Sequence, residues 1–219
     1  MAGMAHRMKA HPAYQDWADV YDTDCNQTRD LDAQLLREAG LPLEGAQVVE
    51  LGAGTGKNTV FLAEQAAEVV ALDFSSAMLD KARRRKLGAH VAFVEHDIRY
   101  PWPVPDRAAD VIVSNLVLEH ISDLEPVFAA AARAQKPQGW LYLSELHPYR
   151  QLGGRGARFE RAGRRVDVET HLHTVSDYVN GARAHGYELA WMQEAAEATT
   201  AAPEDVLPRL LIVVFRKAS

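Results

Sequence analysis

The segment VVELGAGTG, from Val48 to Gly56, decides the fold because it joins a short apolar strand to a glycine-rich turn. Gly52, Gly54 and Gly56 follow GxGxG spacing and directly precede a helical segment. Glycine is needed where the main chain turns sharply and approaches a ligand closely, since a Cβ atom would obstruct that approach. A strand, this turn and a helix in that order predict a nucleotide-binding site. A tight turn without a ligand is the alternative.

The position after the third glycine narrows the kind of ligand. A dinucleotide site favours GxGxxG, whose last glycine lets the helix pack on the strand while the helix N-terminus holds a pyrophosphate. Lys57 occupies that position here. The turn therefore favours a ligand with an adenosine and no pyrophosphate. S-adenosylmethionine meets this description, with its carboxylate at the helix N-terminus and Glu50 as a partner for its ammonium.

Strand-like and helical segments alternate outward from this turn, as in parallel strands joined by crossover helices. We therefore expect an α/β fold, a doubly wound, mostly parallel sheet of seven strands with helices on both faces. The expected strands cover residues 47–51, 68–72, 91–95, 109–114, 140–145, 187–194 and 209–216. The expected helices cover residues 57–65, 76–86, 123–134 and 176–185, and two amphipathic helices at 12–22 and 30–39 precede the first strand.

Length and composition fit one globular domain. The chain has 219 residues, 47% of them hydrophobic and 25% charged, so we expect residues 1–219 to form a single domain. A formal net charge of −6 argues against nonspecific binding to nucleic acid. The single cysteine, Cys25, fits a reducing compartment, and no apolar run approaches the roughly 20 residues of a membrane-spanning helix. We expect a cytoplasmic protein without a membrane partner, and a loose tail at residues 1–11.

Further features lie at the strand ends, where an open α/β sheet binds ligands. Asp73 ends the second expected strand about 20 residues beyond the glycines, from where a carboxylate accepts hydrogen bonds from ribose hydroxyls. Phe74 and Met78 follow it and are placed to flank an adenine. Asp97 and Ile98 end the third strand, where they can accept the adenine amino proton and cover the ring. An N-cap role for Asp73 and a solvated loop position for Asp97 are the alternatives.

With the end of the fourth expected strand, Ser114 to His120, these segments resemble the class I S-adenosylmethionine-dependent methyltransferases, in particular the small-molecule group often called the type 11/12 methyltransferase domain. The resemblance runs from about Gln47 to Glu145 and thins out beyond. It implies S-adenosyl-L-methionine as the cofactor and the strand order 3-2-1-4-5-7-6 with strand 7 antiparallel. The cofactor-binding residues that it and the spacing indicate are Tyr14, Trp17, Tyr21, Glu50, Gly52, Ala53, Gly54, Gly56, Asn58, Asp73, Phe74, Met78, Asp97, Ile98, Asn115, Leu116 and His120.

Two regions outside the expected sheet are assigned to covering the site. Residues 1–40 look like the N-terminal cap that family members fold over the cofactor, although a plain amphipathic helix is the rival for the aromatic segment. Residues 147–173 interleave glycines with arginines and show little periodicity, so we expect a mobile lid or substrate loop. Guanidinium groups suit carboxylates and phosphates. Arg158 and His171 are therefore assigned to the acceptor, with a solvated basic loop as the alternative.

Methyl transfer from a sulfonium leaves a neutral thioether, so the leaving group needs no acid. Positioning and water exclusion supply much of the rate, and a base adds more where the acceptor is a hydroxyl. Histidine is the usual base near neutral pH. His147 is ranked first, His173 second, and Glu145 is a further option, while a structural role is at least as well supported for each histidine. The histidines lack the fixed spacing of a metal site, so no metal is expected.

The predicted function is methyl transfer from S-adenosylmethionine to a small molecule, with an anionic acceptor as the finer hypothesis. The alternatives are an RNA or tRNA methyltransferase, a non-catalytic S-adenosylmethionine-binding regulatory protein, and an NAD-dependent dehydrogenase. Acidity and a fourth-strand end that reads SNLV in place of an N-P-P-Y type sequence argue against a nucleic-acid substrate. The identity of the acceptor, the atom methylated and the oligomeric state, a homodimer included, stay open.

Overall fold

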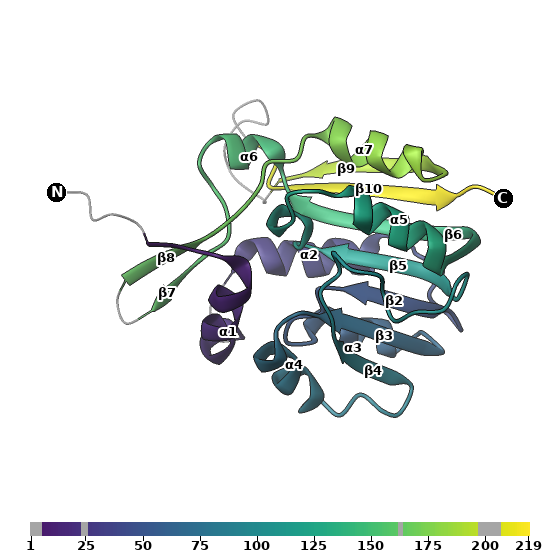
Figure 1. Ribbon diagram of the computed structural model, residues 1–219, viewed down its shortest axis with the longest axis horizontal. Helices are drawn as coiled ribbons and strands as arrows, with labels where there is room; N and C mark the ends of the chain where they lie inside the picture. The colour runs from purple at the N-terminus through teal and green to yellow at the C-terminus, as the bar shows by residue number, and fades with distance from the viewer. Residues whose placement is uncertain (1–5, 23–25, 162–163, 197–206) are drawn as a thin grey trace.

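The computed structural model of the chain describes residues 6–22, 26–161, 164–196 and 207–219. Its main feature is a seven-stranded sheet in the order β4-β3-β2-β5-β6-β10-β9 (Figure 1). The strands are β2 (Gln47–Leu51), β3 (Glu68–Asp73), β4 (Val91–Glu95), β5 (Ala109–Asn115), β6 (Gln135–Leu146), β9 (Tyr187–Ala195) and β10 (Leu210–Lys217). β10 runs antiparallel to both of its neighbours, and the other pairs are parallel. Counted along the chain, this is the expected order 3-2-1-4-5-7-6, which is confirmed together with the antiparallel last strand.

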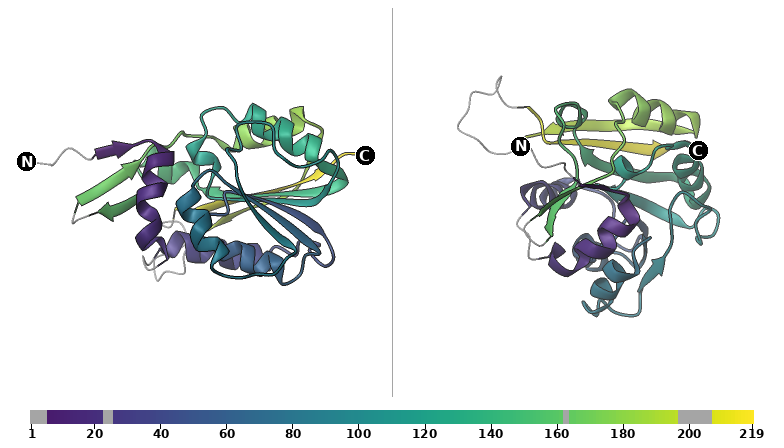
Figure 2. Two further views of the ribbon diagram at one scale, coloured as in Figure 1. Left: turned by 60° about the horizontal axis from the view of Figure 1, so that its bottom comes forward. Right: turned by 60° about the vertical axis from the view of Figure 1, so that its left-hand side comes forward.

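Helices cover both faces of this sheet. They include α2 (Gln27–Glu38), α3 (Lys57–Ala63), α4 (Ser76–Arg83), α5 (Glu125–Ala134) and α7 (Val175–Ala184). Neighbouring strand residues point to opposite faces, so Val49 and Ile112 pack with α5 and α7, whereas Val48 and Val111 pack with α2 and α3. Figure 2 shows the sheet between these two layers. Burial on both faces explains why β5 and β10, inside the sheet, are mostly apolar runs.

A helix and a small sheet lie beyond the carboxyl ends of the parallel strands, at the left of Figure 1. The helix is α1 (Ala10–Tyr21), and the small sheet joins β1 (His6–Met8), β8 (Arg164–Val168) and β7 (Arg158–Arg161). Trp17 of α1 packs with Met78 of α4 and with Phe159, Val166 and Val168 of the small sheet. This third apolar cluster holds α1 and the small sheet over the carboxyl edge.

Two expectations about irregular segments are wrong. Residues 147–173 contain regular structure, namely α6 (Pro148–Leu152) and the antiparallel pair β7 and β8. Val166 and Val168 alternate toward α1 as strand residues do, but the surrounding arginines and glycines obscure that period in the sequence. Residues 6–11 are not a loose tail, because His6–Met8 form β1 and α1 begins at Ala10. Cys25 and residues 1–5 lie outside the described residues.

Some element ends also differ from expectation. β6 begins at Gln135 instead of residue 140, because Gln135 already pairs with Ala109 across an irregularity in β5. α3 and α4 end at Ala63 and Arg83, shorter than the expected helices. Within the described ranges, no helix combines the length and the apolar character needed to cross a membrane.

Candidate functional site

The glycine-rich turn joins β2 to α3, and each of its glycines has a positive φ. The φ angles are 68° at Gly52, 53° at Gly54 and 77° at Gly56. A Cβ atom on Gly52 would lie 2.2 Å from Cγ2 of Val117, whereas one on Gly54 would meet no atom within 4 Å. Gly52 thus lets the turn pack against the segment after β5, and Gly54 faces open space that a ligand can approach.

Asp73, at the end of β3, lies beside this turn. Its carboxylate accepts hydrogen bonds from the backbone N–H of Gly54 and of Ser75, each at 2.8 Å. Burial raises the pKa of Asp73 to about 6, and the two N–H donors oppose that rise. The N-cap role belongs to the neighbouring Ser75, whose side chain accepts from the N–H of Met78 at the start of α4. Asp73 is therefore held by the turn and does not cap the helix itself.

A cavity of about 510 Å³, here named the turn cavity, opens at this edge of the sheet. Small-molecule sites usually enclose roughly 300–1,000 Å³. Twelve predicted site residues line it: Tyr14, Tyr21, Gly52, Gly54, Asp73, Phe74, Asp97, Ile98, Asn115, Leu116, His120 and His171. The structure thus brings the ends of β2, β3, β4 and β5 together with α1 around one space. His171, which we assigned to the acceptor, belongs to this cavity.

The other predicted cofactor residues lie outside the lining of the turn cavity: Trp17, Glu50, Ala53, Gly56, Asn58 and Met78. Glu50 is buried beneath the turn, where it accepts a hydrogen bond from Oγ1 of Thr59 at 2.5 Å. Burial raises the pKa of Glu50 to about 8. Gly56 is the N-cap residue of α3, and Met78 packs beneath α1. Direct contact of these residues with a cofactor stays a prediction.

Asp32 is a buried acid that the sequence did not single out. It lies on α2, is 3% exposed, and accepts hydrogen bonds from Nδ2 of Asn115 at 2.8 Å and of Asn58 at 3.3 Å. Burial raises the pKa of Asp32 to about 6. These contacts fasten α2 to the end of β5 and the start of α3. An acid on an amphipathic helix gives no sequence signal that distinguishes it from a solvent-facing residue.

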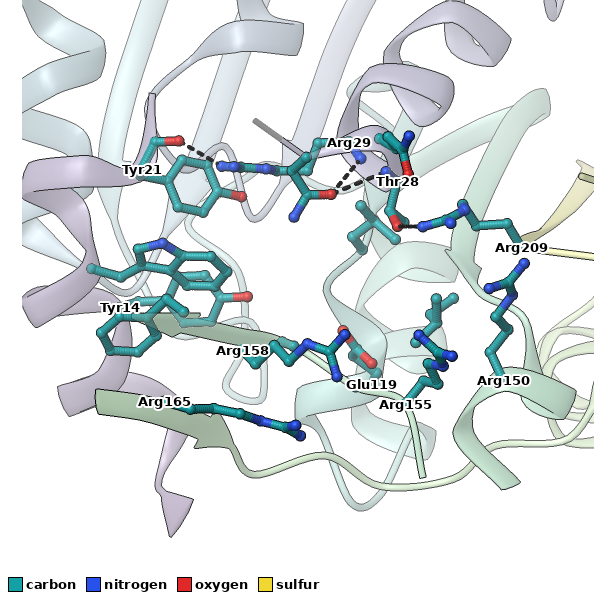
Figure 3. Close-up of a pocket in the computed structure, with 18 residues that line it drawn as sticks. Tyr14, Tyr21, Thr28, Arg29, Glu119, Arg150, Arg155, Arg158, Arg165 and Arg209 are labelled. Atoms are coloured by element: carbon teal, nitrogen blue, oxygen red, sulfur yellow. Dashed lines mark hydrogen bonds between the residues drawn. The ribbon is translucent and has the colours of Figure 1, made fainter. Parts of the chain in front are cut away.

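A second cavity, of about 630 Å³, adjoins the first and is here named the arginine cavity (Figure 3). Its lining includes six arginines: Arg29, Arg150, Arg155, Arg158, Arg165 and Arg209. Glu119 is the one acid among the described residues that line it. Tyr14, Tyr21 and Leu116 line both cavities and form a shared wall.

Three of the arginines are fixed by neighbouring groups. The Arg29 guanidinium lies 4.0 Å from the centre of the Tyr21 ring and donates to the Tyr21 carbonyl at 2.8 Å. Arg209 donates to Oγ1 of Thr28 at 2.7 Å. Arg150 donates to the main-chain carbonyls of residues 207 and 208. These contacts fix the direction in which each guanidinium group lies at the cavity.

The remaining arginines come from the segment that follows α6 and includes β7 and β8. Arg165 forms an ion pair with Asp167 at 2.7 Å. Arg155 and Arg158 are exposed, and no hydrogen bond or ion pair joins the guanidinium group of either to another described residue. Guanidinium groups in such surroundings are free to bind a carboxylate or a phosphate, often through two parallel bonds.

The residues predicted as bases line neither cavity. Nδ1 of His147 accepts from the N–H of Tyr149 at 3.2 Å and caps α6, while Nε2 donates to Glu194 at 3.0 Å. Nε2 of His173 donates to the carbonyl of Ile121 at 2.7 Å. Both rings are buried and engaged in local structure. The geometry does not support either histidine as the base, so we do not retain those assignments.

Glu145 is likewise engaged in supporting the segment after β5. Its carboxylate accepts hydrogen bonds from the backbone N–H of Val117 at 3.2 Å, of Leu118 at 3.0 Å and of Glu119 at 3.4 Å. It thereby fixes the short 3-10 helix η1 (Leu118–His120), and burial raises its pKa to about 8. Glu145 is not part of either cavity lining, and we do not retain it as a base.

His120 connects η1 to α1. Its Nδ1 lies 2.9 Å from the carbonyl oxygen of Glu169, which can only accept, so Nδ1 donates. In the neutral ring Nε2 then accepts from the hydroxyl of Tyr14 at 2.9 Å. Glu119, the preceding residue, faces the arginine cavity and was not assigned a role from the sequence. The available signal was its place beside His120 at the end of the fourth strand.

Within the part of the chain that is described, no three His, Cys, Asp or Glu side chains are arranged to hold a metal.

Residues 49–143 match a family model described as a methyltransferase domain. An uncharacterized methyltransferase of Emericella nidulans is 30% identical over 218 residues, which cover 81% of this chain and 75% of that protein.

Two further similarities extend this comparison. The malonyl-[acyl-carrier protein] O-methyltransferase of Serratia marcescens is 32% identical over 161 residues, covering 74% of this chain but only 60% of that enzyme. The crystal structure of an S-adenosylmethionine dependent methyltransferase from Mesorhizobium loti superimposes with a TM-score of 0.71 at 24% identity, covering 84% of this chain and 96% of that one. The structural likeness concerns the fold.

Proposed function

The chain belongs to the class I S-adenosylmethionine-dependent methyltransferases, and on this basis we propose that the turn cavity holds the cofactor and the arginine cavity holds a small anionic methyl acceptor. The assignment of an anionic acceptor depends on the six arginines that line the arginine cavity, which shares a wall with the turn cavity. The Serratia relative is named for a malonyl acceptor, which bears a free carboxylate, and this agrees with the proposal.

The turn cavity suits the cofactor. Asp73 presents a carboxylate that Gly54 and Ser75 hold in place, which suits ribose hydroxyls. Asp97 and Ile98 line the same space and suit an adenine edge and face. When bound, S-adenosylmethionine supplies a methyl group that its positively charged sulfur activates. These residues hold and orient it.

The arginine cavity positions the second substrate. Arg155 and Arg158 have no ion-pair partner among the described residues, so they are available to an incoming anion. Tyr14, Tyr21 and Leu116 stand between the two spaces, so a cofactor and an acceptor bound in the two cavities would meet beside them. Holding two reactants in a fixed orientation in a site that excludes water can account for much of the rate.

Calorimetry tests both halves of this proposal. S-adenosylhomocysteine, the demethylated product, is titrated first, and succinate, malate and inorganic phosphate are then titrated into the saturated protein. We expect Arg158→Ala and Arg155→Ala each to weaken binding of these anions about 3- to 10-fold, as for a partly solvated charged hydrogen bond. Both variants keep their affinity for S-adenosylhomocysteine.

Arg84→Ala is the matched control, because Arg84 is exposed at the end of α4 and lines neither cavity. It should change neither affinity. Lack of S-adenosylhomocysteine binding by the wild type refutes the cofactor half. Lack of binding by all the anions, or equal anion binding by the arginine variants, refutes the acceptor half.

A further inference from the structure

Glu119 is an acid in a cavity that is otherwise built for anions. Its side chain is buried, with the residue 4% exposed. Oε2 accepts a hydrogen bond from Nε2 of Gln151 at 3.2 Å, and Oε1 lies 3.7 Å from Nε2 of His120. Oε1 accepts no hydrogen bond from any residue that the structure describes. Figure 3 shows Glu119 among the arginines that line the cavity.

The carboxylate does not serve to neutralise those arginines. No ion pair joins Glu119 to an arginine of the cavity within the described ranges, and Gln151, its hydrogen-bond donor, is uncharged. A negative charge at this place repels an anionic ligand and therefore lowers its affinity. Some other use of the carboxylate has to account for its place in the cavity.

The position of Glu119 relative to the shared wall suggests that use. Glu119 faces the arginine cavity, whereas the adjacent His120 faces the turn cavity. Tyr14 lines both cavities and donates to His120 at 2.9 Å. Leu116, at the other end of the same short segment, also lines both. The Glu119 carboxylate thus lies beside the boundary that the methyl group crosses under the proposed function.

We propose that Glu119 is the general base of the reaction and that the acceptor is a hydroxylated acid, methylated on its hydroxyl oxygen. This inference rests on the proposed function. The Glu119 carboxylate takes the hydroxyl proton, and the oxygen electron pair forms the new bond to the methyl carbon. The electron pair of the broken carbon–sulfur bond stays on sulfur, which leaves as a neutral thioether. An acceptor methylated on an ionised carboxylate or phosphate oxygen has no such proton and needs no base.

The surroundings of Glu119 set when it is ionised. Burial raises its pKa, while His120 and the Gln151 amide act against the rise. A base with a pKa nearer neutral is more effective at neutral pH than a fully solvated carboxylate. The charged or titratable groups that face it from the packed elements are His120 of η1, Glu145 of β6, Tyr14 of α1, Tyr178 of α7, Arg29 of α2, Arg150 of α6, and Arg155, Arg158 and Arg165 of the segment beyond.

The first test counts protons without turnover. Succinate and malate, which differ by one hydroxyl, are titrated into the complex with S-adenosylhomocysteine in two buffers of different ionisation enthalpy. An anion bound beside Glu119 disfavours the ionised carboxylate. Near the pH at which Glu119 titrates, the wild type should therefore take up a fraction of a proton when the anion binds. Glu119→Gln keeps an oxygen that accepts from Gln151, binds both acids at least as tightly, and loses this uptake.

The second test follows turnover of hydroxylated acids: malate, 3-hydroxybutyrate, salicylate and glycerol 3-phosphate. With the acid that the wild type methylates fastest, Glu119→Gln should lower kcat about 100-fold or more, as for loss of a general base, with little change in KM. The wild-type rise of kcat with pH disappears in Glu119→Gln and persists in Glu119→Asp, which keeps a carboxylate.

The outcomes separate this inference from the proposed function. Equal proton uptake in the wild type and Glu119→Gln, or a kcat and pH profile that the substitution leaves unchanged, overturns the role of Glu119. Methylation of succinate as fast as of every hydroxylated acid overturns the acceptor class. If no anion binds the wild type at all, the proposed function fails, and this inference fails with it.

Discussion

The turn cavity and the arginine cavity share a wall but differ in the ionisable groups around them. Beneath the turn cavity lie the buried acids Asp32, Glu50 and Asp73, and burial raises the pKa of each. The arginine cavity gathers six guanidinium groups from several separate elements. A cofactor with a sulfonium and an ammonium fits the first environment, and an acid fits the second. The difference implies that each cavity selects its own ligand, so substitutions in one should leave the affinity of the other intact.

Removing the Asp73 carboxylate should give the largest difference between the affinities for the two ligands. Asp73→Ala deletes the acceptor of two backbone N–H groups and the proposed partner of the ribose. Charged hydrogen bonds contribute about 1.5–3 kcal/mol each, so affinity for S-adenosylhomocysteine should fall about 100-fold. Affinity for succinate, measured by calorimetry on the same sample, should stay within about twofold of wild type.

Asp80→Ala is the matched control, since Asp80 is exposed on α4 and pairs only with the nearby Arg83 among described residues. It should change neither affinity. If Asp73→Ala lowered the affinity for both ligands equally, the two cavities would behave as one coupled site and would not select their ligands separately.

Substitution of Gly54 should also separate the affinities for the two ligands, but by a smaller factor than substitution of Asp73. Gly54→Ala adds a Cβ atom that meets nothing within 4 Å, but it does so at a φ of 53° and inside the turn cavity. The left-handed conformation costs about 1–2 kcal/mol, so the fold should persist. We expect S-adenosylhomocysteine affinity to fall about tenfold while succinate affinity is retained, because a methyl group now occupies ligand space.

Gly52→Ala is the informative counterpart, because its Cβ atom would lie 2.2 Å from Cγ2 of Val117. The segment after β5 must then move, and that segment includes Leu116 of the shared wall. Affinity for both ligands and the melting temperature should fall together. A Gly52→Ala protein that lost only S-adenosylhomocysteine binding would contradict this account of the wall.

The turn cavity was readable from the sequence because its residues follow strands in register with the glycines. The carboxyl ends of parallel strands meet at one edge, so Asp73, Asp97 and Asn115 converge wherever their strands are identified. The alternation of strands and helices indicates those strands directly. The order of the sheet came from the family resemblance, and the structure confirms it.

The arginine cavity was only partly readable, because its residues converge through tertiary packing. Arg158 was found from the arginine-rich segment, but Arg29 and Arg209 lie far from that segment in the chain. His147 follows the fifth strand as expected, yet Pro148 starts a helix there and the ring caps it. A strand end predicts where a side chain lies, while the next turn of the chain decides which cavity it faces.

Glu119 and His120 illustrate the same limit within two residues. Both follow the fourth strand in the sequence, but η1 turns Glu119 toward the arginine cavity and His120 toward the turn cavity. No periodicity of a strand or a helix specifies a three-residue 3-10 turn. The division of one segment between two sites therefore had to come from the structure.

The smallest predicted effect concerns Glu50, one of the acids beneath the turn cavity. Burial and the nearby carboxylates Asp73 and Asp32 raise the pKa of Glu50 to about 8 in the folded protein, whereas it titrates at its ordinary, lower pKa when unfolded. Between these two values the folded state binds more protons, so the contribution of Glu50 to stability falls as pH rises through that window. Glu50→Gln removes this dependence and keeps an oxygen to accept from Thr59.

Thermal unfolding of the unliganded protein at pH 5 and pH 8.5 measures that change. We expect Glu50→Gln to have a melting temperature relative to wild type that is at least about 3 °C more favourable at pH 8.5 than at pH 5. Asp32, Asp73 and Glu145 also have raised pKa values, so some pH dependence remains in the variant. Glu64→Gln, at an exposed position, should reproduce the wild-type dependence. Parallel curves for wild type and Glu50→Gln would show that folding does not raise the pKa of Glu50.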